Sequence, residues 1–140
     1  MKTKSFKNLE LSRLGMGNMR LPRVGNQPKG DIDYDAAKAM IDTAMANGIN
    51  YYDTAYVYHE QTSETFLGKA LKEYPRDSYY LATKFYIRAN PDYKAVLEEQ
   101  LEKLQTDYID FYLVHCIMDD NYQEYMDSGC IAYFDQMKKE

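Results

Sequence analysis

Four residues that can take part in proton transfer stand at the ends of predicted strands in this 140-residue sequence. Asp53 follows a strand expected over 49–52, and Lys84 follows one over 79–83. His115 follows a strand over 108–114, and Tyr58 lies in the loop after the first of these strands. Because the carboxyl ends of the parallel strands in a barrel meet at one rim, we expect the four side chains to lie close together.

These groups suit the protonation of an alkoxide while a carbonyl is reduced. A tyrosine hydroxyl ordinarily has a pKa of about 10, and a nearby ammonium favours the phenolate and makes a phenol a stronger acid. Lys84 can supply that ammonium to Tyr58, and Asp53 can hold Lys84 as an ion pair. His115 can orient the carbonyl or relay the proton. None of these groups supplies hydride, so a nicotinamide cofactor would have to do so.

Each residue also has a plainer interpretation when it is taken alone. Asp53 can cap a turn, and Lys84 can be a solvated charge. His115, at the end of an apolar strand, can be a structural histidine with satisfied hydrogen bonds. Tyr58 is one of 15 tyrosines. The placement of all four on one rim is what favours a catalytic function.

Two local ambiguities remain open in the sequence. Periodicity does not decide whether Tyr56 or Tyr58 faces the site, and the neighbouring His59 and Glu60 can be charges on the rim. The pair Gly15 and Gly17 can mark either a tight turn or the close approach of a cofactor.

The alternation of short strands with longer helices predicts an α/β fold with one parallel sheet. The first strand is expected over 11–17. Helices are expected over 34–47, from Ser63, from Pro91 with Asn90 as its N-cap, and over 131–139. Asp33 is the expected N-cap of the first helix, and Gly48 is expected to end it. Four βα units with right-handed crossovers place the helices on one side of the sheet.

Composition narrows the class of protein. The chain is 45% hydrophobic and 28% charged, which is typical of a globular domain. No apolar run approaches the roughly 18 residues of a membrane span, and the polar N-terminus does not match a secretory signal. The net charge of −5 disfavours nucleic acid and anionic membranes as partners. Cys116 and Cys130 form no CxxC pair, so we expect no metal site and a cytoplasmic protein with reduced thiols.

Four segments of the chain resemble the aldo-keto reductases, and together they extend over nearly all of it. They are LGMGNMRL (14–21), NGINYYDTAYVYHEQTSETFLGKAL (47–71), YYLATKF (79–85) and LEKLQTDYIDFYLVH (101–115). The second is the most specific, with a DTAxxY core followed by an SExxLG-like helix start at Ser63. The resemblance implies an NADPH-dependent oxidoreductase of the TIM-barrel type, a (β/α)8 barrel, that reduces small-molecule aldehydes and ketones to alcohols.

The resemblance also implies roles for particular residues. The family's catalytic aspartate falls on Asp53, its lysine on Lys84 and its histidine on His115. Its proton-donating tyrosine comes five residues after the aspartate, on Tyr58 rather than Tyr56.

The cofactor assignments rest on the resemblance as well. The segment after the first barrel strand lies near the nicotinamide in the family, which implies that Gly17, Asn18 and Met19 lie beside the cofactor, with Asp53 near its ribose. The pair Asn18-Met19 stands where many members have Thr-Trp.

Length sets a further expectation. A (β/α)8 barrel takes about 250 residues, so the resemblance places 1–140 on the N-terminal half-barrel, the first four βα units. In the family the later loops hold the cofactor's phosphates, so we expect weak or absent turnover from these residues alone. Residues 1–140 do not determine the natural substrate or the preference for NADPH over NADH.

The segments YYLATKF and LEKLQTDYIDFYLVH also resemble a branch of the family that carries a C-terminal ferredoxin-like extension. An iron–sulfur cluster needs four cysteine ligands, and the two cysteines of this chain are too few.

A half-barrel has two unpaired sheet edges and an uncovered inner face. We therefore expect self-association into a homo-oligomer. Two alternatives to an enzyme follow. One is a non-catalytic half-barrel module that pairs with a copy of itself or with a partner. The other is a sensory subunit that binds nucleotide without useful turnover.

Overall fold

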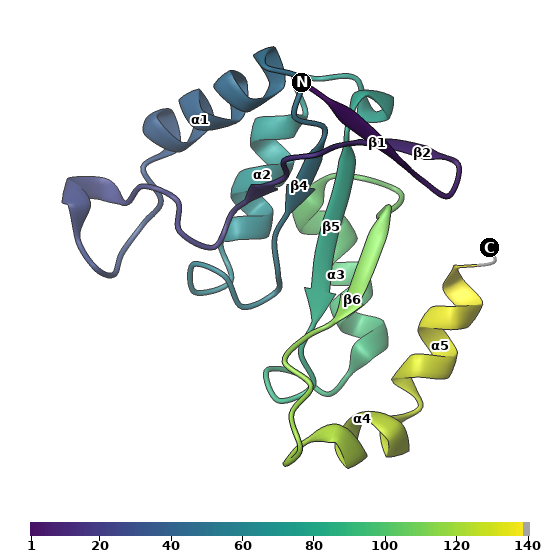
Figure 1. The fold of residues 1–140 in the computed structure, drawn as a ribbon. Coiled ribbons are helices and arrows are strands. Elements are labelled where there is room, and N and C mark those ends of the chain that lie inside the picture. Colours follow the sequence, from purple (N-terminus) through teal and green to yellow (C-terminus); the bar gives the residue numbers. More distant parts are fainter. Residues whose placement is uncertain (139–140) are drawn as a thin grey trace.

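The computed structural model describes residues 1–138 as an α/β fold around one parallel sheet (Figure 1). The sheet has the order β3-β4-β5-β6, and each neighbouring pair of strands is parallel. The strands are β3 (Met16–Gly17), β4 (Tyr51–Asp53), β5 (Tyr80–Phe85) and β6 (Phe111–Val114). The predicted parallel sheet is confirmed, and its form is that of a partial (β/α) barrel.

The prediction of one strand across 11–17 is wrong. Residues 3–12 form an antiparallel hairpin of β1 (Thr3–Phe6) and β2 (Leu9–Ser12), which lies at the end of the sheet where β5 begins (Figure 1). The Ser12 hydroxyl donates to the Leu14 carbonyl at 2.7 Å, so the chain turns there and re-enters as β3. The Phe6 ring packs 6.0 Å from that of Phe111 at the start of β6.

Helices cover one face of the sheet, as predicted (Figure 1). They are α1 (Tyr34–Ala46), α2 (Ser63–Leu71) and α3 (Tyr93–Leu104). Asp33 caps α1 by accepting from the Ala36 amide at 3.1 Å, and Gly48 follows the helix with φ 77°. Both features match the sequence prediction.

Gly68 allows α2 and α3 to meet through their backbones. A Cβ atom at this position would lie 2.3 Å from the Lys103 carbonyl oxygen of α3. Any larger residue would therefore push the two helices apart, which explains the glycine in the SExxLG-like segment.

Two helix predictions need correction. Helix α3 is capped by Asp92, which accepts from the Ala95 amide at 3.1 Å. The predicted cap, Asn90, instead accepts from the Asp92 amide at 3.0 Å, so it shapes the turn before the helix. After β6 the chain forms α4 (Tyr122–Ser128), which the sequence did not predict, and α5 (Cys130–Met137). The predicted end of the last helix at 139 lies outside the described residues.

Two further short elements complete the fold, the 3-10 turns η1 (Val24–Asn26) and η2 (Arg76–Ser78). Within residues 1–138 no helix combines the length and the apolar character that a membrane crossing needs.

The hydrophobic core lies between the sheet and its helices in two clusters. The first joins α1 and α2 to the sheet around Ile41, Tyr52 and Leu81. The second joins α3, α4 and α5 to the sheet around Phe85 and Tyr125. Both clusters lie on the helix side of the sheet, so neither of them covers the opposite face.

That opposite, inner face carries alternate residues of the strands. Asp53 pairs with Ala82, and Lys84 pairs with Leu113, in the register of β4, β5 and β6. Leu113 is 39% exposed. Strands β3 and β6 are the edges of the described sheet. Strand β6 therefore has an unpaired backbone edge as well as an exposed apolar side chain, and both features favour association with another chain.

We expect this 16.4 kDa chain to self-associate through its inner face. Size-exclusion chromatography with light scattering should give a mass that rises above the monomer value with concentration. Leu113→Gln should weaken the association. Ile131→Gln, at a residue of α5 that is 42% exposed, should leave the association unchanged. A monomeric mass at every concentration would contradict the expectation.

Candidate active site

The Lys84 ammonium joins three of the residues at the rim. Its Nζ lies 2.6 Å from Asp53 Oδ1, 2.7 Å from the Thr54 carbonyl oxygen and 3.3 Å from Tyr58 Oη. Asp53 is the last residue of β4 and Lys84 is the fifth of the six in β5, so both lie inside the strands rather than after them. An ammonium has three hydrogens, and each of them has an acceptor here. Since Tyr58 Oη accepts from Lys84, its own hydrogen is free to be donated elsewhere.

His115 stands beside Tyr58 at the end of β6. The two rings pack edge to face with their centroids 5.7 Å apart. The backbone of His115 is held on both sides, since its amide donates to the Phe85 carbonyl at 2.8 Å and its carbonyl accepts from the Tyr125 hydroxyl at 2.6 Å. All four residues that the sequence placed on one rim are therefore neighbours.

His115 is set up to act as a neutral imidazole. Burial lowers its pKa below the ordinary histidine value, the charge of Lys84 lowers it further, and Asp53 raises it. The Nδ1 atom is buried and has no hydrogen-bond partner among residues 1–138. This leaves Nε2 as the nitrogen that can meet a bound molecule.

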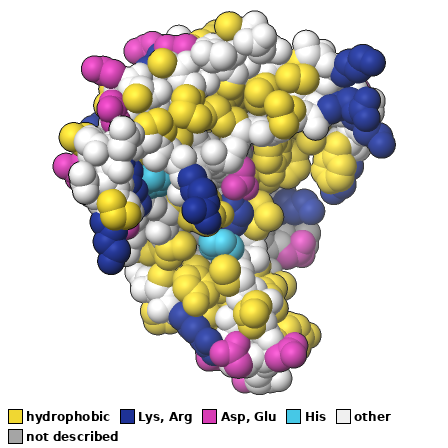
Figure 2. Space-filling view, turned by 60° about the vertical axis from the view of Figure 1, so that its left-hand side comes forward, with side chains coloured by type: hydrophobic (Ala, Val, Ile, Leu, Met, Phe, Trp, Pro, Cys, Tyr) yellow, Lys and Arg dark blue, Asp and Glu magenta, His cyan; other side chains and the backbone are white. Residues whose placement is uncertain are grey.

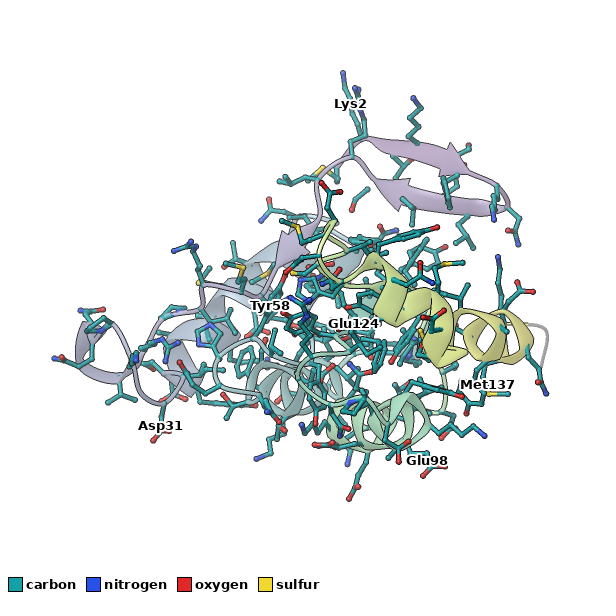
Figure 3. All side chains as sticks on the ribbon, turned by 90° about the horizontal axis from the view of Figure 1, so that it is seen from below. Lys2, Asp31, Tyr58, Glu98, Glu124 and Met137 are labelled. Atoms are coloured by element: carbon teal, nitrogen blue, oxygen red, sulfur yellow. The ribbon has the colours of Figure 1, made fainter. Side chains whose placement is uncertain are left out.

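The structure decides between Tyr56 and Tyr58. The Tyr56 hydroxyl donates to Glu99 Oε2 of α3 at 3.0 Å, and Tyr56 is only 5% exposed. Tyr58 instead contacts Lys84, and Figure 3 shows it near the centre of the molecule when viewed from the end where α4 lies.

A buried polar network supports Asp53. The amide and the side-chain Nδ2 of Asn18 both donate to the Asp53 carbonyl at 2.9 Å. The Ser63 hydroxyl donates to the Asn18 carbonyl at 3.0 Å and lies 2.9 Å from the Thr54 hydroxyl. The ends of β3 and β4 and the start of α2 are thereby tied together.

The three residues expected beside the cofactor differ in their surroundings. Met19 is 50% exposed, and a Cβ atom at Gly17, also exposed, would meet no other atom within 4 Å. Asn18 is fully buried, so the structure assigns its side chain to the support of Asp53. The contacts of Gly17, Asn18 and Met19 with a cofactor stay predictions.

A second buried network, on the helix side of β5, supports Lys84. Glu64 Oε1 accepts from the Thr83 hydroxyl at 2.5 Å and from Gln100 Nε2 at 2.6 Å. Gln100 Nε2 also lies 3.2 Å from the Lys84 carbonyl oxygen, and its Oε1 accepts from the Tyr112 hydroxyl at 2.6 Å. Sequence reasoning missed this network. The signal for it was Gln100, a polar residue between Val96 and Leu104 on the buried stripe of α3.

Glu64 is a buried carboxyl group, and the charge of Lys103 has only a minor influence on it. Burial raises its pKa, and the hydrogen bonds from Thr83 and Gln100 only partly oppose this effect. Its Oε2 has no partner in the part of the chain that the structure describes. The neutral acid therefore persists to higher pH than in an exposed glutamate.

The hypothesis that His59 is a charge on the rim is wrong, because His59 is 5% exposed. Its Nε2 accepts from the Leu21 amide at 2.9 Å, while its Nδ1 is buried. Glu60 is an exposed charge, paired with Arg23 at 2.9 Å. Figure 2 shows histidine side chains on one face of the molecule, together with basic and acidic side chains and a broad hydrophobic surface.

Metal ligands do not gather in this structure. No group of three or more His, Cys, Asp or Glu side chains among residues 1–138 is arranged to hold a metal ion.

Comparisons with known proteins define the class of this molecule. The model of the Aldo/keto reductase family matches residues 13–140, and the chain belongs to this family. A probable aldo-keto reductase of Glycine max is 36% identical in an alignment of 117 positions that covers 76% of this chain and 33% of that protein. Aldo-keto reductase YhdN of Bacillus subtilis is 36% identical in an alignment of 118 positions that covers 76% of this chain and 35% of the relative.

Solved structures agree with the family assignment. The holo form of an aldo-keto reductase from Bacillus halodurans is 32% identical and superimposes with a TM-score of 0.74, over 99% of this chain and 47% of that one. The chain thus spans about a third of the length of these two relatives and about half of the solved barrel.

The raised pKa of Glu64 leads to a stability prediction. In the unfolded chain Glu64 ionises above about pH 4.5, whereas in the folded chain it keeps its proton to higher pH. Its stabilising contribution is therefore complete below pH 4.5 and is lost as the pH rises through the folded pKa, at up to about 1.4 kcal/mol per pH unit. Glu64→Gln does not titrate, so its stability relative to wild type should grow from pH 5 to pH 8 in urea denaturation.

Glu99→Gln is the matched control for this measurement. The Lys103 hydrogen bond lowers the pKa of Glu99 below its ordinary value of 4.5, so this carboxylate is ionised in both the folded and the unfolded chain from pH 5 to pH 8. The stability of Glu99→Gln relative to wild type should therefore stay constant over that range. Equal pH profiles for the two variants would contradict a raised pKa for Glu64.

Proposed function

We propose that these residues carry the catalytic centre of an NADPH-dependent oxidoreductase that reduces aldehydes and ketones to alcohols. The observation that carries the proposal is the contact of the Lys84 ammonium with both Asp53 and Tyr58, at 2.6 and 3.3 Å. Family membership supports the same activity.

Tyr58 is the proposed proton donor to the oxygen of the carbonyl group. Because its Oη accepts from Lys84, its own hydrogen can be directed at a bound substrate, and the ammonium stabilises the phenolate left behind. Asp53 keeps the ammonium in place as an ion pair. We assign the positioning of the substrate oxygen to His115 through Nε2. When bound, the nicotinamide cofactor supplies the hydride.

The rim beside Asp53 fits such a cofactor. Gly17 offers open space next to the end of β4, and Met19 offers an exposed apolar side chain. We propose that both contact the nicotinamide end, with Asp53 near the ribose, while Asn18 holds the Asp53 backbone from inside. In this proposal residues 1–140 form one unit, the N-terminal half of the barrel.

Two further assignments belong to the proposal. We place the protein in the cytoplasm, because Cys116 and Cys130 are both free thiols and thiols persist in reducing compartments. The alternative of a non-catalytic, self-associating module gives no reason for a lysine that is bonded to both a carboxylate and a phenol on the open side of the sheet.

A matched pair of tyrosine variants tests the proposal. NADPH oxidation should be followed with 4-nitrobenzaldehyde as the substrate. Tyr58→Phe removes the proton donor and should lower the rate by about 10²- to 10⁴-fold. Tyr56→Phe removes a hydroxyl that faces Glu99 on α3 and should retain the wild-type rate within a few-fold. Because weak turnover is expected from these residues alone, the comparison is made on rates above the enzyme-free background. Equal rates above that background for wild type and Tyr58→Phe would refute the assignment.

A further inference from the structure

The three residues after Tyr58 form a strained turn. His59, Glu60 and Gln61 all have left-handed backbone conformations, with φ of 49°, 51° and 70°. For residues with a side chain, the left-handed helical conformation is unfavourable because the Cβ atom lies too close to the following carbonyl oxygen. Such a turn persists only where neighbouring contacts hold it, and its position decides where Tyr58 lies.

Contacts from two sides hold this turn. The Thr62 amide and hydroxyl both donate to the His59 carbonyl, at 3.0 and 2.6 Å. Across from it, the Arg23 guanidinium bonds both oxygens of Glu60, at 2.9 and 3.3 Å. The His59 ring lies between these contacts and accepts from the Leu21 amide.

The bond from Leu21 to His59 is the buried member of this set. Leu21 is 4% exposed and His59 is 5% exposed, whereas the Glu60 side chain is 60% exposed. An exposed ion pair contributes little to stability, whereas a buried amide that loses its acceptor destabilises the fold by its full desolvation penalty. The imidazole is therefore the contact on which the turn depends most.

We propose that His59 is a positioning residue for Tyr58. The neutral ring accepts a hydrogen bond from Leu21 and so connects the segment after β3 to the left-handed turn. Protonation of the ring breaks this bond, and the segment and the turn can then move apart. The proposal rests on the proposed function only in taking Tyr58 as the proton donor.

The chemistry of the imidazole explains the release. In a protonated ring Nε2 carries a hydrogen and can no longer accept a hydrogen bond. The Nε2–H and the Leu21 N–H then point at each other and repel. The charged groups around the ring are Arg20 and Arg23 from the segment after β3 and Glu60 from its own turn. His59 also lines a cavity of about 400 Å³ that is open to solvent, so protons can reach its surroundings.

The electrostatics favour the neutral ring at neutral pH. Burial lowers the pKa of His59, Arg23 lowers it further, and Glu60 raises it. The unfolded chain therefore binds this proton before the folded chain does. The stability that the neutral ring contributes is complete above about pH 6.5 and is lost as the pH falls toward the lower folded value.

Two variants test the proposal while leaving the backbone strain in place, because both keep a Cβ atom at position 59. His59→Gln retains an acceptor near the Nε2 position and does not titrate, whereas His59→Leu leaves the Leu21 amide without an acceptor. The Leu21 amide and the Tyr58 ring are followed by NMR from pH 4.5 to pH 8.

In the wild-type chain both signals should shift together as the pH falls. The midpoint of the shift should equal that of the His59 imidazole titration and lie below the ordinary histidine pKa of 6.5. In His59→Gln they should stay flat near their wild-type positions at pH 8, and in His59→Leu they should be displaced at every pH. Signals that stay flat while His59 titrates would overturn the proposal, as would wild-type Tyr58 signals in His59→Leu.

The second histidine is controlled for separately. The chain has two histidines, and His115 also contacts the Tyr58 ring. In a His115→Gln background the shift of Tyr58 should persist with the His59 midpoint; its disappearance would assign the effect to His115 and overturn the proposal. Because these spectra need neither cofactor nor substrate, they are independent of the reduction assay. A failure of the proposed function and a failure of the positioning role are therefore distinguishable.

Discussion

The site depends on one ammonium group with three acceptors. The side chain of Lys84 is 12% exposed, and a charge withdrawn from water in this way is tolerated only when it is paired and hydrogen-bonded. Asp53 supplies the paired charge, and the Thr54 carbonyl and Tyr58 hydroxyl complete the set. The requirement that Lys84 be satisfied thus brings a carboxylate and a phenol to the same point. The chemistry proposed for this family member follows from that arrangement.

The surrounding fold supports the Lys84, Asp53 and Tyr58 side chains from one side only. Two buried polar networks provide this support. One centres on Asn18 and Ser63 and fixes the Asp53 backbone, and the other centres on Glu64 and Gln100 and fixes β5. The hydrogen bonds of these networks restrict the positions of the strand ends that carry Asp53 and Lys84. Because all of these supports approach from the strands and the helix side, the opposite side of Tyr58 and His115 is left for a bound molecule.

The sequence predicted the features that depend on local pattern. The end of each strand could be located well enough to place Asp53, Lys84 and His115 on one rim, and Asp33 and Gly48 bounded α1 as capping rules require. Periodicity could not decide between Tyr56 and Tyr58, because the residues after Asp53 form turns without a regular period, and only the family resemblance favoured Tyr58. Contacts between residues distant in sequence were also missed, including Glu64 with Gln100 and His59 with Leu21. The hairpin at residues 3–12 escaped notice for the same reason, since its place is set by Asn50 and Phe111 far along the chain.

The central claim is that one ammonium contacts both the carboxylate and the phenol. The most direct measurement is the NMR resonance of the Lys84 NH3⁺ group in ¹⁵N-labelled protein, assigned with Lys84→Met. The account predicts a resonance slowed in its exchange with water, and a change in its shift in both Asp53→Asn and Tyr58→Phe. A Lys84 resonance that exchanges as fast as those of surface lysines, or that is unchanged in Tyr58→Phe, would contradict the account.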